Sequence, residues 1–136
     1  MLASLALGVL ATLAGPALAQ PAGRVTKVAA HRRGALLWPE NSLLAFRNAA
    51  ETLGADFLEF DVHLSKDGQV VVIHEPTLER TTTGRGLVRA HTLAELHALR
   101  LRDRTGALTD EPVPSLDDVV ALAMRTHRQM LLEIKV

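Results

Sequence analysis

The sequence has 136 residues, about the length of one domain, and its 48% hydrophobic and 22% charged residues exclude a disordered or fibrous chain. Fifteen basic and fifteen acidic residues give a formal net charge of zero, so no basic excess indicates a nucleic-acid-binding protein. The sequence contains no cysteine, which excludes disulfide bonds and thiolate metal sites.

A cleaved export signal is predicted over residues 1–19. This stretch has no charged side chain, is rich in alanine and leucine, and has small residues at Ala17 and Ala19, a pattern typical of a signal-peptidase site. Gly15 and Pro16 interrupt an apolar run that is already short for a membrane-spanning helix. We expect an exported protein, periplasmic or secreted, with no stable membrane span after cleavage. An uncleaved anchor and a core helix are the alternatives.

The next segments predict a strand, a helix and a second strand. β-Branched residues and alanines predict a strand over residues 25–30. Apolar residues at helical spacing follow, with Asn41 or Ser42 as the N-cap and Gly54 as the stop signal. Apolar and polar residues then alternate in "FLEFDVHL", which predicts a strand over residues 57–64.

A tight turn and a third strand come next. Asp67 and Gly68 form a turn signal, and "QVVVIH" predicts a strand over residues 69–74. Residues 77–89 have no apolar period and contain two glycines, so we expect a loop. Such a loop can close over a ligand, but its local chemistry favours a solvated segment.

The last part of the chain predicts two helices and a fourth strand. The stretch "TLAELHALRL" predicts a short helix beginning near Thr92, and "VPSLDDVVALAMRTH" predicts another with Ser115 as N-cap and Asp118 three residues later. The chain ends in "QMLLEIKV", a predicted strand. This order of elements is typical of an α/β fold with a largely parallel sheet, either open or part of a barrel.

Two carboxylates lie on one face of the second predicted strand. Glu59 and Asp61 are two residues apart and point to the same side, whereas Leu58 and Phe60 point to the other. Adjacent carboxylates repel each other and are costly to desolvate, and a bound cation removes both penalties. Oxygen ligands favour Ca²⁺ or Mg²⁺. An exposed antiparallel strand with its polar side in water is the alternative.

The last predicted strand repeats this arrangement. Glu133 and Lys135 share one face, with apolar residues on the other. Glu133 would complete the metal site, and Lys135 would neutralise an anionic ligand bound beside it. A solvated strand face is the alternative explanation for both.

Two histidines end predicted strands. His31 follows the first strand and His74 ends the third, and catalytic groups gather at such carboxyl ends in parallel α/β folds. Two imidazoles with solution pKa values of about 6.5 can act as general base and general acid. Arg32 follows His31, and its guanidinium suits a pair of phosphate oxygens. The other histidines, including His63 on the acidic face, are interpreted as structural, which is also the alternative for any single histidine.

Taken together, these residues resemble the glycerophosphodiester phosphodiesterase family. The match covers "AHRRGALLWPENSLLAFRNAAETLGADFLEFDVHLSKDGQVVVIHEPTLERTTTGRG" and "LLEIKV". The family pattern is a His-Arg-Gly start, a Pro-Glu-Asn-Thr segment, a Glu-x-Asp strand, a His-Asp-Pro strand end with an Arg-Thr-Thr loop, and a later Glu-x-Lys strand. This chain departs from the pattern at Arg33, Ser42 and Glu75, where the family has Gly, Thr and Asp.

The resemblance implies a TIM-type (β/α)8 barrel that uses Ca²⁺ or Mg²⁺ to hydrolyse a small-molecule glycerophosphodiester to sn-glycerol 3-phosphate and an alcohol. Carried over to this sequence, it implies site residues in three roles. The metal ligands are Glu59, Asp61 and Glu133, the acid/base pair is His31 and His74, and the substrate-binding residues are Arg32, Lys135 and Glu40.

The largest departure from the family is the length of the chain, because a complete barrel needs about 250 residues and this sequence has 136. We therefore expect residues 24–136 to be the N-terminal half of the phosphodiesterase domain, truncated at its fourth strand and inactive by itself. A phospholipase D-like lyase of the same barrel superfamily and a non-catalytic phosphate-ligand binding protein are the alternative functions.

Overall fold

The computed structural model describes residues 26–31 and 37–135, so the expected export signal and Arg32 lie outside the described residues. The main sheet has four strands: β1 (Ala29–Ala30), β2 (Phe57–Leu64), β3 (Val70–Val72) and β6 (Gln129–Ile134). β2 pairs in parallel with β1 and β6 and antiparallel with β3, which confirms the largely parallel sheet. Within the described ranges, no helix is long and apolar enough to cross a membrane.

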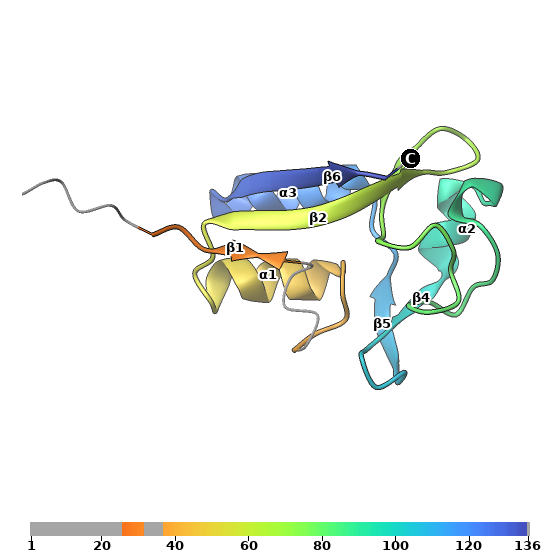
Figure 1. Cartoon of the computed structure of the whole chain (residues 1–136), viewed down its shortest axis with the longest axis horizontal. Helices are drawn as coiled ribbons and strands as arrows, with labels where there is room; N and C mark the ends of the chain where they lie inside the picture. The colour runs from red at the N-terminus through yellow and green to blue at the C-terminus, as the bar shows by residue number, and fades with distance from the viewer. Residues whose placement is uncertain (1–25, 32–36, 136) are drawn as a thin grey trace, which may run out of the picture.

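The last strand lies directly beside β2 rather than beyond β3. The register pairs Phe57 with Gln129 at one end and Asp61 with Glu133 near the other. β1, β2 and β6 are therefore three neighbouring parallel strands, and their carboxyl ends meet at one end of the sheet (Figure 1). This placement brings together the strand ends on which chemistry was predicted.

Two helices cover one face of this sheet. α1 (Leu43–Glu51) begins after Ser42, whose hydroxyl accepts the backbone N–H of Ala45, and α3 (Leu116–Thr126) begins at a capping box formed by Ser115 and Asp118. Ser115 was predicted as an N-cap and Ser42 was one of two predicted candidates. Both helices are amphipathic, so each buries one apolar stripe.

The apolar face of β2 packs against these helices. Leu58, Phe60 and Val62 are 0%, 0% and 4% exposed and join a core with apolar residues of α1 and α3. The rings of Phe60 and Phe46 meet edge to face, with centroids 5.8 Å apart and an interplanar angle of 74°. The alternation in the sequence thus assigned the core face of β2 correctly, and the opposite face carries Glu59 and Asp61.

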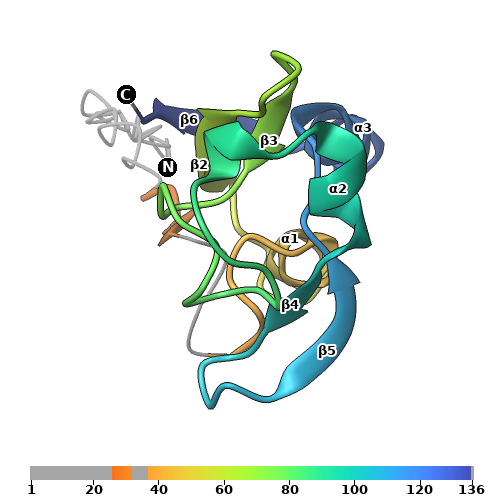
Figure 2. The same ribbon diagram turned by 90° about the vertical axis from the view of Figure 1, so that its right-hand side faces the viewer.

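A second lobe is inserted between β3 and α3 and lies beyond the carboxyl end of the sheet (Figure 1). After β3 it contains the short 3₁₀ helix η2 (Val88–Ala90), α2 (Leu93–Ala98), and a hairpin of β4 (Arg100–Arg102) and β5 (Leu108–Pro112). Figure 2, seen from the side of this lobe, shows the hairpin next to α1. The Glu111 carboxylate of β5 accepts the backbone N–H of Leu44 at 3.0 Å, which fastens the hairpin to the helix.

The sequence prediction of this lobe missed its hairpin, since neither β4 nor β5 was predicted. The helix beginning after Thr92 ends at Ala98, and the residues that follow form β4, although the whole stretch 92–101 had been predicted helical. β4 has only three residues, of which Leu101 is 2% exposed, so it is too short to show a period of its own. Its conformation comes from pairing with β5, a contact that the local sequence does not specify.

The loop after β3 is anchored rather than solvated, which corrects the interpretation from local chemistry. Leu78 is 0% exposed and Thr82 is 1% exposed. The Thr82 hydroxyl donates to the Leu78 carbonyl at 2.6 Å and accepts the Gly84 backbone N–H at 2.9 Å. A Cβ at Gly84 would lie 2.6 Å from Leu99 Cδ1 and 3.0 Å from Leu78 Cδ1, so the loop packs closely against these two leucines, which would have to shift to admit a side chain. The residues between Leu78 and Thr82 are therefore held in place.

Candidate active site

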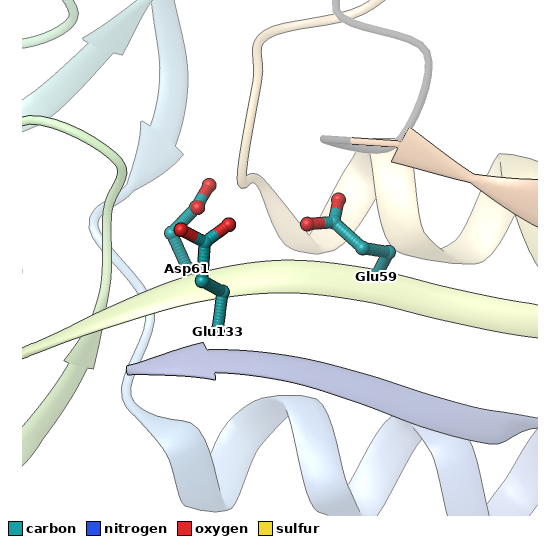
Figure 3. Close-up of side chains that lie close together, drawn as sticks. All are labelled: Glu59, Asp61 and Glu133. Carbon is teal, nitrogen blue, oxygen red and sulfur yellow. The ribbon is translucent and has the colours of Figure 1, made fainter. Parts of the chain in front are cut away.

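Three carboxylates meet at the carboxyl end of the parallel strands. Glu59 and Asp61 project from the same side of β2, and the strand register sets Glu133 of β6 directly beside Asp61. One ligand atom from each carboxylate lies within 4.8 Å of those of the other two. Figure 3 shows the three side chains on one side of the ribbon, with Asp61 and Glu133 adjacent and Glu59 apart from them, nearer the start of β2.

Lys135 compensates part of this negative charge. Its Nζ lies 3.1 Å from Oδ1 of Asp61 and forms an ion pair with Glu133. The ammonium group lowers the pKa of Glu133 below its ordinary value, and Glu133 in turn raises the pKa of Lys135. Lys135 had been expected to hold an anionic ligand, whereas here it contacts the carboxylates themselves.

The donor set fits a hard divalent cation. Asp61 is 1% exposed, and its Oδ2 has no hydrogen-bond partner although it is buried. A buried carboxylate oxygen without a partner is costly, and a cation bound beside Oδ2 of Asp61 would remove that cost. An all-oxygen group of ligands from rigid strands suits Ca²⁺ or Mg²⁺ rather than a softer metal. Glu59, Asp61 and Glu133 are therefore the residues that could hold such an ion.

His74 lies near these carboxylates, just after β3. Together with Glu133 and Lys135 it lines an open pocket at the end of the sheet. Its Nδ1 is 3.1 Å from Oε1 of Glu75, and its backbone carbonyl accepts Nε2–H of His63 at 3.1 Å. His63, interpreted from the sequence as structural, thus fixes the backbone of His74 from the acidic face of β2.

Glu40 is joined to the same region through an arginine. Nη1 and Nη2 of Arg80 donate to the two carboxylate oxygens of Glu40 at 2.9 and 2.6 Å. The Arg80 Nε also donates to Oε1 of Glu75 at 3.1 Å. Glu40 itself is fixed by a tight turn, because the next residue, Asn41, adopts a left-handed conformation with φ of 56° that asparagine tolerates well. Glu40 therefore supports a basic group, and that group is Arg80.

The remaining predicted site residues belong to the first strand. His31 follows β1 and its side chain is exposed. Since Ala30 pairs with Leu58, His31 follows at the level of Glu59, at the same end of the sheet as the carboxylates. Arg32, predicted to bind the phosphodiester, lies outside the described residues.

Sequence reasoning missed Arg80. Local chemistry favoured a solvated loop, and only the pattern of an Arg-Thr-Thr sequence soon after a strand-ending histidine could have indicated a role. Of the two carboxylates that Arg80 binds, Glu40 is 40 positions away in the sequence, so no periodicity links it to Arg80. The arrangement as a whole combines a carboxylate cluster that could hold a cation, histidines able to transfer protons, and basic groups that can offset an anion.

Comparisons with known proteins agree with one another. Residues 31–136 match the sequence profile of the glycerophosphoryl diester phosphodiesterase family. A glycerophosphodiester phosphodiesterase of Caldanaerobacter subterraneus is 42% identical over 111 residues, covering 81% of this chain and 45% of the relative. A crystal structure of glycerophosphodiester phosphodiesterase from Agrobacterium tumefaciens has a TM-score of 0.73 at 34% identity, with 82% of this chain and 48% of the other covered.

A third similar protein was solved with a ligand. The phosphodiesterase from Oleispira antarctica, in complex with the product sn-glycerol-3-phosphate, has a TM-score of 0.72 at 32% identity, with 81% of this chain and 44% of the other covered. In each of these comparisons the chain spans about half the length of the protein that it matches.

Proposed function

Because this chain belongs to the glycerophosphoryl diester phosphodiesterase family, we propose that the protein hydrolyses a glycerophosphodiester to sn-glycerol 3-phosphate and an alcohol. The observation that carries the proposal is the convergence of Glu59, Asp61 and Glu133 beside His74 at the carboxyl end of the parallel strands. The sn-glycerol-3-phosphate described as product in the Oleispira antarctica enzyme supports the same substrate class.

The carboxylate cluster would bind the divalent cation, Ca²⁺ or Mg²⁺. Such an ion supplies Lewis-acid chemistry, because it stabilises negative charge on a phosphate oxygen. Asp61 offers a buried oxygen without a partner, Glu133 lies next to it, and Glu59 lies nearby, two residues earlier on β2. Lys135, and Arg32 as the resemblance in the sequence implies, would offset the remaining charge of the phosphodiester.

The histidines would transfer the protons. One of His31 and His74 takes the proton of the attacking hydroxyl group as its oxygen forms a bond to phosphorus. The other gives a proton to the alcohol oxygen as its bond to phosphorus breaks, so no free alkoxide leaves. The water molecule consumed in the overall reaction supplies one hydrogen to the alcohol and its remaining hydroxyl group to the phosphate.

The chain covers about half the length of the relatives that it matches, and its fold corresponds to the N-terminal half of a (β/α)8 barrel. Large apolar side chains of β6 are exposed, which is expensive for a soluble domain and supports the view that further elements pack there. These residues are Met130, Leu131, Leu132 and Ile134. We therefore propose that residues 24–136 are inactive alone, that the complete protein is the active form, and that it is exported after cleavage of residues 1–19.

The complete protein should hydrolyse glycerophosphocholine, and a chelator should abolish turnover until Ca²⁺ or Mg²⁺ is restored. His31→Asn and His74→Asn should each lower kcat by about 10²–10⁴-fold. His127→Asn is the matched control, because His127 ends α3 in a left-handed conformation that asparagine accepts.

Three outcomes would contradict this function. Near-native activity of His31→Asn or His74→Asn would contradict the assignment of these histidines as general acid and base. Accumulation of a cyclic phosphate without sn-glycerol 3-phosphate would indicate a lyase, and tight binding of the substrate without turnover would indicate a binding protein.

A further inference from the structure

We propose that Arg80 is a positioning residue of this site, which clamps Glu75 so that Glu75 holds His74 in the tautomer with hydrogen on Nδ1. The inference rests on the proposed function, because it assigns a role to Arg80 in the reaction that His74 serves. The group formed by Glu40, Arg80 and Glu75 is called the carboxylate–arginine clamp below. The sequence analysis predicted no role for Arg80.

The bonds of the clamp form a continuous chain that ends at His74. Arg80 binds Glu40 in a fork of two hydrogen bonds of 2.9 and 2.6 Å. On its other side, Nε and Nη2 of Arg80 lie 3.1 and 3.0 Å from Oε1 of Glu75. The same oxygen of Glu75 lies 3.1 Å from Nδ1 of His74. One planar guanidinium thus fixes two carboxylates, and one of them meets the imidazole.

An ionised carboxylate beside a ring nitrogen decides the tautomer. It can only accept a hydrogen bond, so Nδ1 of His74 must carry the hydrogen. The lone pair of the neutral ring is then on Nε2, the nitrogen that can accept a proton from a bound ligand. The charge of Arg80 and the hydrogen bond with His74 both keep Glu75 ionised, since they hold the pKa of Glu75 below its ordinary value, the hydrogen bond most of all.

Arg80 is held too firmly to be a mobile surface arginine. It lies in the loop between the buried residues Leu78 and Thr82, which are joined by the 2.6 Å bond from the Thr82 hydroxyl to the Leu78 carbonyl. Glu40, at the other end of the fork, has a side chain that is only 12% exposed. The backbone of His74 is fixed separately by His63, and the clamp contacts the ring through Glu75.

The same geometry argues against two other roles for Arg80. Substrate binding is disfavoured because a phosphate at this guanidinium would lie beside the carboxylates of Glu40 and Glu75. A mainly stabilising role is disfavoured because the Arg80 side chain is 47% exposed, and ion pairs near the surface contribute about 0–1 kcal/mol. Positioning of His74 accounts for the bonds of Arg80 with Glu40 and Glu75 without requiring substrate binding or a stabilising role.

Arg80→Ala in the complete protein should lower kcat by about 10–100-fold, the usual effect of removing a partner that orients a functional side chain, with KM changed less than about threefold. Added guanidinium ion should restore part of the lost kcat. Arg85→Ala is the matched control, since Arg85 is an exposed arginine of the same loop. If Arg80→Ala does not fold, Arg80→Lys should show a smaller loss of kcat in the same sense, because an ammonium cannot form the planar fork.

A measurement without substrate separates the clamp from the reaction. The ring ¹⁵N chemical shifts of His74 in the labelled protein should report the Nδ1–H tautomer in the wild type and a mixture of tautomers in Arg80→Ala. An unchanged tautomer, a rise in KM with unchanged kcat, or kinetics equal to those of Arg85→Ala would overturn the proposal. If the wild type hydrolyses no glycerophosphodiester, the proposed function fails, while the ¹⁵N shifts still decide whether the clamp exists.

Discussion

Replacing Asp61 with asparagine should remove most of the thermal stabilisation that Ca²⁺ or Mg²⁺ gives to the protein. Asp61 is 1% exposed, one of its oxygens contacts Lys135, and the other has no partner. A cation bound there satisfies that oxygen and offsets the repulsion from Glu133, so it should stabilise the folded state specifically. The asparagine side chain of the variant would offer one neutral oxygen in place of a charged carboxylate, which is a poor ligand for a hard cation in this cluster.

The size of the effect follows from mass action. A ligand present at 100 times its Kd and bound only by the folded state adds about 2.7 kcal/mol to the free energy of unfolding. For a domain of about 250 residues, each kcal/mol raises Tm by roughly 2–4 °C, so the wild type should gain about 5–11 °C on saturation. Asp61→Asn should gain less than about 2 °C.

The assay is thermal unfolding of the complete protein, with and without chelator, followed by circular dichroism. Comparing each variant with itself in chelator cancels any change in stability that the substitution causes directly. Asp110→Asn on β5 is the matched control, because it removes a carboxylate that is not part of the cluster, and it should keep the full shift. A wild-type shift in Asp61→Asn, or no shift in the wild type at millimolar cation, would refute the metal site.

Two further predictions concern the core and the acid range. Phe60→Ala should lower the free energy of unfolding, measured by urea titration, by about 3–5 kcal/mol, because Phe60 is 0% exposed. Leu64→Ala on the same strand should lower it by less than about 0.5 kcal/mol, because Leu64 is 60% exposed. Equal losses in the two variants would contradict the packing. Because the pKa of Glu75 is lowered in the folded state, Glu75 stabilises the fold above its unfolded pKa of about 4.3, and this contribution is lost as pH falls through the folded pKa. Thermal unfolding between pH 3 and 7 should therefore show a smaller acid-induced loss of Tm in Glu75→Gln than in the wild type, and parallel curves would argue against the shift.

Strand alternation explains why much of the cluster could be predicted. On β2 and β6 the side-chain period of two determines which residues share a face, whatever the partner strand is. Glu59 and Asp61 therefore had to lie on one side and Phe60 on the other, as observed. The N-caps at Ser42 and Ser115 were predictable for a similar reason, because a cap depends on residues within one turn.

Contacts between distant segments explain what could not be predicted. β4 is too short to show a periodicity, and it is a strand only because β5 pairs with it. Lys135 was expected to meet a bound anion, but the register of β6 on β2 brings it to Asp61 as well as to its neighbour Glu133. The loop carrying Arg80 has a composition typical of solvated segments, yet Leu78 and Thr82 bury it against the end of α2.

The sequence by itself therefore indicated which side chains could bind a cation or transfer protons, and it determined on which face of each strand they lie. Local periodicity, capping and ligand type are properties of neighbouring residues, so they can be recognised without a fold. Only the tertiary structure decided which of these groups meet: it set Glu133 beside Asp61 through the parallel pairing of β6 with β2, and it joined Glu40 to His74 through Arg80 and Glu75. The reason is that strand register and long-range hydrogen bonds depend on how separate elements pack, and no local pattern along the chain encodes that packing.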